Sequence, residues 1–154
     1  MEHLEKFIIK AKLNGWVGAE PGGKKISSSR MGSLDITFED DHFFYQDSFV
    51  GISDFCGHES VCFKNEPVWS QAYYGHIVRA DIFDGQQTVE ILRAALSAMY
   101  REGRFLGPFE FQHGQYQYRD TNQGNFKNFS GQEEILHNDI VVYRLLYFGG
   151  LVRK

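Results

Sequence analysis

Apolar and polar residues alternate along this chain with two different periods, which predict helices and strands in turn. Apolar residues recur at the spacing of one helical face in two places, first at Leu4, Phe7, Ile8 and Ala11 and later at Val89, Leu92, Ala95, Leu96 and Met99. The first run predicts a helix from about Glu2 to Leu13, with nearby charged residues such as Lys12 largely off its apolar face. The second run predicts a helix from Thr88 to about Arg101.

Elsewhere the pattern changes to the two-residue alternation of strands whose two faces differ in burial. It predicts eight short strands, at Leu34–Phe38, His42–Asp47, Glu59–Phe63, Val68–Tyr74, Pro108–Gln112, Gln115–Asp120, Glu133–His137 and Ile140–Phe148. Short turn sequences separate neighbouring strands, which favours antiparallel hairpins. Residues 17–29 have no such period and contain three glycines and one proline, so we expect a mobile surface loop there.

The two helix-and-strand stretches share a sequence pattern. The first contains Tyr45, Asp47, Gly51, Phe55, Gly57, Glu59, Trp69, Tyr73 and Gly75, and the second contains Tyr118, Asp120, Gly124, Phe129, Gly131, Glu133, Tyr143, Tyr147 and Gly149 in the same order, with one inserted residue. Such self-similarity is typical of a repeated structural unit.

We therefore predict an α+β fold built by internal duplication of a helix plus a four-stranded antiparallel meander, with two halves related by a pseudo-twofold axis. The eight strands would form one strongly curved sheet or two packed sheets, with the apolar faces of both helices against them. Residues 1–154 would be a single domain, with repeat 1 at about 2–75, a connector at 76–87 and repeat 2 at about 88–152.

Composition limits the class of protein. The chain is 42% hydrophobic and 16% aromatic, which is typical of a globular, strand-rich protein. Its net charge of −4 argues against a nucleic-acid partner, and no apolar run is long enough to cross a membrane. Two cysteines without a secretion signal predict reduced thiols and a cytoplasmic location, and a Cys56–Cys62 disulfide is disfavoured because Cys62 falls within a strand. The oligomeric state is left open.

No cofactor or metal is expected from the motifs. No histidine or cysteine spacing matches a zinc site. The run from Gly18 to Lys24 is similar to a phosphate-binding loop, but Lys25 stands where that loop needs a serine or threonine to hold magnesium. The run also follows a predicted helix rather than a strand, so we reject this interpretation.

The candidate chemistry lies in the repeated acids. Strand alternation places Tyr45 and Asp47 on one inward face, and Glu59 on the inward face of its own strand. One interpretation is a carboxylate pair in an aromatic cleft, with raised pKa values suited to acid–base chemistry. The other is structural: Asp47 and Asp120 would accept backbone N–H bonds from the loops that follow them, and Glu59 and Glu133 would accept tyrosine hydroxyls or backbone donors. Recurrence in both halves favours the structural role, because a catalytic site is usually single.

Residues that occur in one half only are better functional candidates by the same logic: Arg30, His42, His58, Cys62, Gln71, His76 and Arg79. The combined set of ligand-binding candidates is Arg30, Tyr45, Asp47, Glu59, Trp69, Gln71, Tyr73, His76, Tyr118, Asp120, Glu133, Tyr143 and Tyr147. None of these can be assigned a catalytic role from the sequence.

Several motifs together resemble a known family: Arg30-x-Gly32-Ser33, Tyr45-x-Asp47, Phe55-x-Gly57-x-Glu59, Pro67-x-Trp69, Tyr73-Tyr74-Gly75 and Tyr147-Phe148-Gly149-Gly150. They resemble a bacterial family of domains of unknown function found alone or C-terminal to XRE-type helix-turn-helix regulators, and the likeness covers nearly the whole chain. It implies a soluble bacterial domain that senses a small molecule when fused to a regulator. It brings no catalytic residues.

Three functions remain open. The first is binding of a small molecule in a cleft lined by aromatic residues and carboxylates. The second is an enzyme that uses Asp47 and Glu59 with a nearby histidine such as His76. The third is a protein-interaction module that works through an exposed sheet edge or apolar patch.

Overall fold

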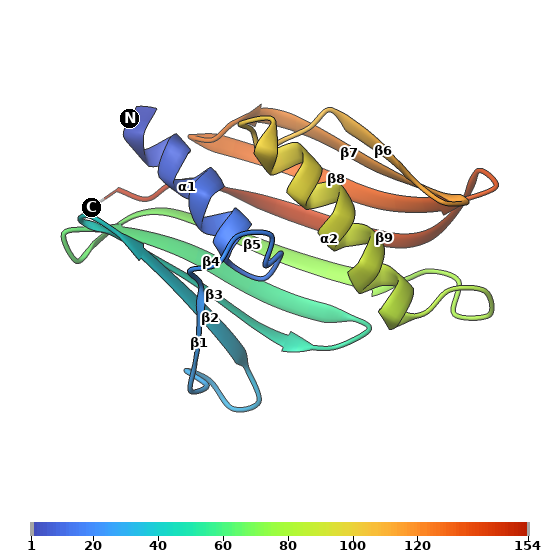
Figure 1. The fold of residues 1–154 in the computed structure, drawn as a ribbon, viewed down its shortest axis with the longest axis horizontal. Helices are drawn as coiled ribbons and strands as arrows, with labels where there is room; N and C mark the ends of the chain where they lie inside the picture. Colours follow the sequence, from blue (N-terminus) through green and yellow to red (C-terminus); the bar gives the residue numbers. More distant parts are fainter. Residues whose placement is uncertain (1, 154) are drawn as a thin grey trace.

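The computed structural model describes residues 2–153 and contains two helices and nine strands in that part of the chain (Figure 1). The helices are α1 (Glu2–Asn14) and α2 (Gly85–Arg101). The strands are β1 (Lys24–Ile26), β2 (Leu34–Asp40), β3 (Phe43–Gly51), β4 (Phe55–Phe63), β5 (Glu66–Ile77), β6 (Phe109–His113), β7 (Tyr116–Asn125), β8 (Asn128–His137) and β9 (Ile140–Leu151).

All nine strands belong to one antiparallel sheet with the order β1-β2-β3-β4-β5-β9-β8-β7-β6. Strands β5 and β9 pair at its centre, from Trp69 opposite Leu151 to Ile77 opposite Tyr143. Both helices lie over the same face of this sheet (Figure 1). The predicted duplication of a helix plus a four-stranded meander about a pseudo-twofold axis is therefore wrong. Pairing β5 with β9 satisfies backbone groups that two separate units would leave on open edges.

The ninth strand, β1, lies in the segment predicted to be a mobile loop. Its residues Lys24, Lys25 and Ile26 pair with Thr37, Ile36 and Asp35 of β2. The side chains of β1 are all exposed, so burial leaves no alternating pattern in its sequence. Backbone hydrogen bonding alone defines this strand, and a hydrophobic period cannot reveal such a strand.

The predicted strands all exist, but the β3–β4 and β7–β8 hairpins extend further than expected. Strand β3 continues to Gly51, and β4 begins at Phe55 directly opposite it. Gly51 has a φ of 94°, and a Cβ there would lie 2.1 Å from the Asp54 carbonyl oxygen. The hairpin tip therefore requires glycine at this position.

Helix α1 ends one residue beyond its predicted end, whereas α2 begins three residues earlier than predicted. Asp84, within the predicted connector at 76–87, is the N-cap of α2: its carboxylate accepts the Gln87 backbone N–H at 2.9 Å. The Gln87 side chain accepts the Asp84 backbone N–H at 3.0 Å in return. This reciprocal capping box satisfies two backbone donors and sets the start of the helix.

The core lies between the helices and the covered face of the sheet. Ile8 of α1, Met99 of α2 and Trp69 of β5 are fully buried there. On the opposite face of the sheet, Leu146 and Phe148 of β9 remain exposed. No helix in residues 2–153 is both long enough and apolar enough to cross a membrane.

Candidate ligand-binding site

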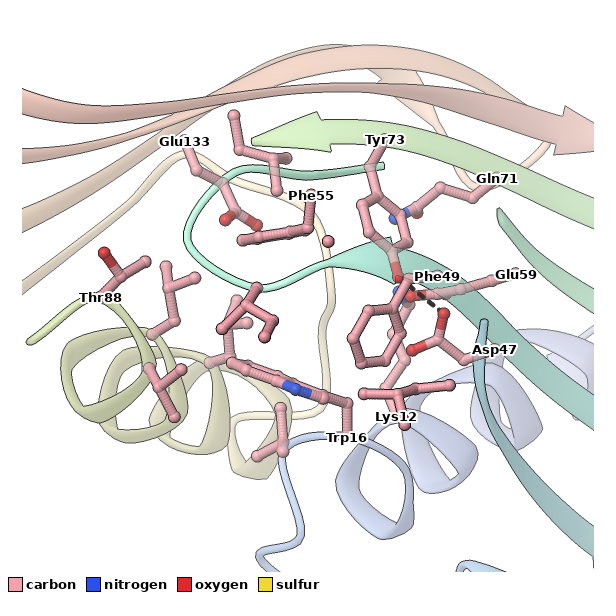
Figure 2. A pocket seen from close by; sticks show the side chains of 18 of the residues that line it. Lys12, Trp16, Asp47, Phe49, Phe55, Glu59, Gln71, Tyr73, Thr88 and Glu133 are labelled. Carbon is pink, nitrogen blue, oxygen red and sulfur yellow. Dashed lines mark hydrogen bonds and ion pairs between the residues drawn. The ribbon is translucent and has the colours of Figure 1, made fainter. Parts of the chain in front are cut away.

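A pocket of about 220 Å³ opens between the covered face of the sheet and the two helices (Figure 2). Trp16, in the turn after α1, and Val89 of α2 contribute to its walls. Phe49 of β3 and Phe55 of β4 add aromatic surface from the sheet. An apolar cavity of about 150 Å³ can hold benzene. This pocket therefore has room for one ring and a short substituent.

Strand register brings two acidic side chains together in the pocket. Asp47 on β3 is directly opposite Glu59 on β4, and Glu59 is opposite Gln71 on β5. Because opposed residues point to the same face of a sheet, all three side chains reach the pocket. The Tyr73 hydroxyl donates a 2.7 Å hydrogen bond to Asp47 Oδ1, drawn as a dashed line in Figure 2.

Lys12 reaches the same place from α1. Its Nζ donates to Glu59 Oε2 at 2.5 Å, and the two side chains are only 5% and 10% exposed. The ammonium also lies 5.5–5.9 Å from the ring centres of Trp69, Tyr100 and Phe105. Lys12 is thus a buried cation held by one carboxylate and three aromatic rings.

Glu133 of β8 contributes a third carboxyl group from the other side of the pocket, near Thr88 (Figure 2). It is only 8% exposed, and among the described residues no donor reaches its Oε2. The arginines of α2 do not supply one, since Arg93 donates to the Trp16 carbonyl and Arg101 to the Ala19 carbonyl. A buried acceptor without a donor is uncommon in folded proteins.

Burial raises the pKa values of these acids into the neutral range. The pKa of Asp47 rises to about 7 because of burial and the nearby negative charge of Glu59, against the Tyr73 hydrogen bond and Lys12. The pKa of Glu133 rises to about 8 because of burial and the charge of Asp120, against Lys12 and the Tyr118 hydroxyl. Both groups therefore exchange protons near neutral pH.

Six of the candidates predicted from sequence line the pocket: Tyr45, Asp47, Glu59, Gln71, Tyr73 and Glu133. The other seven do not: Arg30, Trp69, His76, Tyr118, Asp120, Tyr143 and Tyr147. Arg30 donates to the Ser48 carbonyl at 2.9 Å, and the indole N–H of Trp69 donates to the Phe126 carbonyl at 3.0 Å. His76 stacks on Tyr74.

The remaining candidates form a second cluster outside the pocket. Tyr147 donates to Asp120 Oδ1 at 2.7 Å, and Tyr118 lies 3.5 Å from the other oxygen. Burial raises the pKa of Asp120 to about 6, against these two hydroxyl groups. The hydroxyl of Tyr143 is buried, with no partner among the described residues. The predicted backbone bonds to Asp47 and Asp120 are therefore wrong, because tyrosine hydroxyls take that place.

Of the one-sided candidates, only Gln71 lines the pocket. No histidine of residues 2–153 lines the pocket, and neither do Cys62 and Arg79. Cys56 and Cys62 are both free, which confirms that they form no disulfide. In the same described part, no group of three or more histidine, cysteine, aspartate or glutamate side chains could hold a metal ion.

Lys12 and Trp16 are the functional candidates that sequence reasoning missed. The sequence spacing could have indicated them, since Leu4, Ile8, Lys12 and Trp16 follow one another at four-residue spacing on one helical face. A lysine in such a series is usually assigned to solvent because of its charge. Here the buried Glu59 brings it inward.

Comparison with protein families finds one match, to the family described as a domain of unknown function, DUF5680, over residues 47–152. The match starts in β3, so it includes the three pocket acids but not Lys12 or Trp16. No curated protein and no solved structure shows a significant match to the chain.

Proposed function

The chain belongs to the DUF5680 family, a family of unknown function, and we propose that it binds a small molecule in the pocket between the sheet and the two helices. One observation carries this proposal: the pocket contains acid groups that the fold does not use. Glu133 Oε2 has no donor among the described residues, and Asp47 is bonded only through Oδ1. A concave, mostly apolar site with a few convergent polar groups is typical of ligand pockets.

The energetics support the same proposal. Leaving a buried acceptor unpaired costs about 1–3 kcal/mol. A ligand that donates a hydrogen bond to Glu133 would offset that cost, whereas the chain by itself does not. Glu59, by contrast, already has Lys12 and needs no ligand.

A second candidate function is acid–base catalysis in the same pocket. The pKa values of Asp47 and Glu133, about 7 and about 8, are suited to proton transfer at neutral pH. A histidine partner has no support, since none of the described histidines lines the pocket. Turnover of a bound compound would distinguish catalysis from binding alone.

We also propose a cytoplasmic location and a signalling role for this binding activity. Free Cys56 and Cys62 are compatible with the reducing cytoplasm. The resemblance to bacterial domains fused to helix-turn-helix regulators supports a role in which the bound molecule is a signal.

A thermal-shift screen of metabolites against three proteins tests the binding site. A ligand at 100 times its dissociation constant should stabilise the parent by about 2.7 kcal/mol. Val89→Trp should abolish the shift, because Val89 is a half-buried wall residue and the larger ring fills the pocket. Gln86→Trp is the matched control, since Gln86 is exposed on the same helix and does not line the pocket. Equal stabilisation of all three proteins would show that the ligand binds outside this pocket.

A further inference from the structure

We propose that the ligand is a small organic cation, an ammonium or amidinium group carried on one flat apolar ring, whose charged end donates to Glu133. This inference rests on the proposed function, because it names the class of molecule that the same pocket would take.

The charges that line the pocket favour a cation. Asp47, Glu59 and Glu133 carry carboxyl groups, and Lys12 is the one basic side chain among the lining residues. The ammonium of Lys12 is already paired with Glu59. An incoming anion would therefore meet two acids and no free cation, whereas a cation would meet two acids that lack a basic partner.

Hydrogen-bonding capacity leads to the same class of ligand. Within the described part of the chain, Glu133 has an unpaired acceptor in Oε2, and Asp47 receives a hydrogen bond only at Oδ1. An ammonium group has three N–H donors and no acceptor, so it brings the pocket only the donors that its carboxyl groups lack. A ligand hydroxyl brings one donor together with an acceptor.

The aromatic walls also suit a cation attached to a ring. Trp16, Phe49, Phe55 and Tyr73 present rings to the pocket. The faces of aromatic rings attract cations, and the ammonium of Lys12 lies over the ring of Tyr100, which also lines the pocket. The volume of about 220 Å³ limits the apolar part to about one ring.

The surrounding titratable groups determine how binding should depend on pH. Asp47 faces Lys12, Tyr45, Glu59 and Tyr73, and the charge of Asp35 acts on it from the other face of the sheet. Besides Lys12 and Glu59, Glu133 faces Tyr100, Asp120, Tyr118, Tyr143 and Tyr147. Burial raises the pKa of each of these tyrosines, so they stay neutral below pH 10.

The sign of the pH dependence follows from the two pocket acids. Below about pH 7, Asp47 and Glu133 are mostly protonated and attract a cation weakly. Above about pH 8, both are mostly ionised and attract it strongly. Cation binding should therefore release protons, and its affinity should rise up to about tenfold per pH unit for each proton released.

Calorimetric titration with three probes of similar shape tests the proposal: 2-phenylethylammonium, neutral 2-phenylethanol and anionic 3-phenylpropanoate, each at about pH 6 and about pH 8.5. We expect the ammonium to bind at least about tenfold more tightly than the alcohol at the higher pH, and the propanoate not to bind. Only the ammonium should weaken about tenfold or more at the lower pH, as one displaced proton requires.

Two matched variants locate the effect. Glu133→Gln should reduce the preference for the ammonium over the alcohol and flatten the pH dependence. Glu134→Gln should change neither, because Glu134 does not line the pocket and is bonded to Arg119 and Arg144. Circular dichroism of both variants verifies that each is folded before titration.

Each outcome separates the two proposals. If the alcohol or the propanoate binds as tightly as the ammonium, and Val89→Trp abolishes this binding, the pocket binds ligands but the cation assignment is overturned. If no probe binds at either pH, the cation assignment is also overturned, and the metabolite screen decides the proposed function on its own.

Discussion

Two regions of the sheet each contain a buried aspartate opposite a buried glutamate, and the two glutamates are neutralised in different ways. On β3 and β4, Asp47 is opposite Glu59; on β7 and β8, Asp120 is opposite Glu133. In each region a tyrosine hydroxyl donates to the aspartate at 2.7 Å. The regions differ at the glutamate, because Glu59 is paired with Lys12, whereas Glu133 has no basic partner among residues 2–153.

This difference originates in the helices rather than in the sheet. Helix α1 contributes Lys12, whereas α2 contributes the apolar Met99 to the core and directs its arginines to backbone carbonyls. Glu59 can therefore be neutralised by an ion pair, and Glu133 by holding its own proton. Only the second arrangement leaves the glutamate free to respond to a ligand.

The largest expected effect comes from breaking the ion pair. Lys12→Met should destabilise the protein by about 3–5 kcal/mol at neutral pH, because it leaves Glu59 as a buried charge without a partner. Denaturant unfolding of the parent and the variant measures the loss. The double variant Lys12→Met/Glu59→Gln is the control and should recover most of it. A loss below about 1 kcal/mol in the single variant would show that Glu59 does not depend on Lys12.

An intermediate effect is expected at Glu133, and it should grow with pH. The folded protein holds a proton on Glu133 between the ordinary pKa of 4.5 and about 8, whereas the unfolded chain has lost it. Stability from this group therefore falls as pH rises through that window. Glu133→Gln should nearly match the parent at about pH 5 and exceed it by several kcal/mol at about pH 8.5.

Glu134, the next residue along β8, should show the opposite pH dependence of stability. Glu134 lies on the other face of β8, where Arg119 and Arg144 hold its pKa below the ordinary value despite partial burial. Glu134→Gln should be less stable than the parent at neutral pH, and the difference should shrink as pH falls through the lowered pKa. If Glu133→Gln and Glu134→Gln show the same pH profile, Glu133 is not held protonated by the fold.

The smallest expected effect comes from the two tyrosines. Tyr73→Phe and Tyr147→Phe each remove one hydrogen bond to a buried aspartate and should each cost about 1–2 kcal/mol when that aspartate is ionised. The cost should rise around pH 6 for Tyr147→Phe and around pH 7 for Tyr73→Phe, following the pKa values of Asp120 and Asp47. Unfolding curves collected from about pH 5 to pH 8 test this order, and coincident profiles would contradict it.

The sequence by itself determined the local structure and the buried face. Periodicity predicted both helices and the positions of eight strands, because burial of one face leaves a pattern in each segment. It also placed Tyr45 and Asp47 on the covered face, where both are buried. It did not reveal β1, whose exposed side chains leave no such pattern.

Only the tertiary structure decided how these segments combine. The pairing of β5 with β9 joins residues far apart in the chain, and a pattern within either strand says nothing about its partner. The pocket also depends on the tertiary structure. The positions of the two helices on the sheet bring Lys12 to Glu59 but leave Glu133 Oε2 without a donor among the described residues. The ionisation of a buried acid depends on its neighbours in space, so residue spacing could propose these carboxyl groups but could not tell which of them stays unpaired.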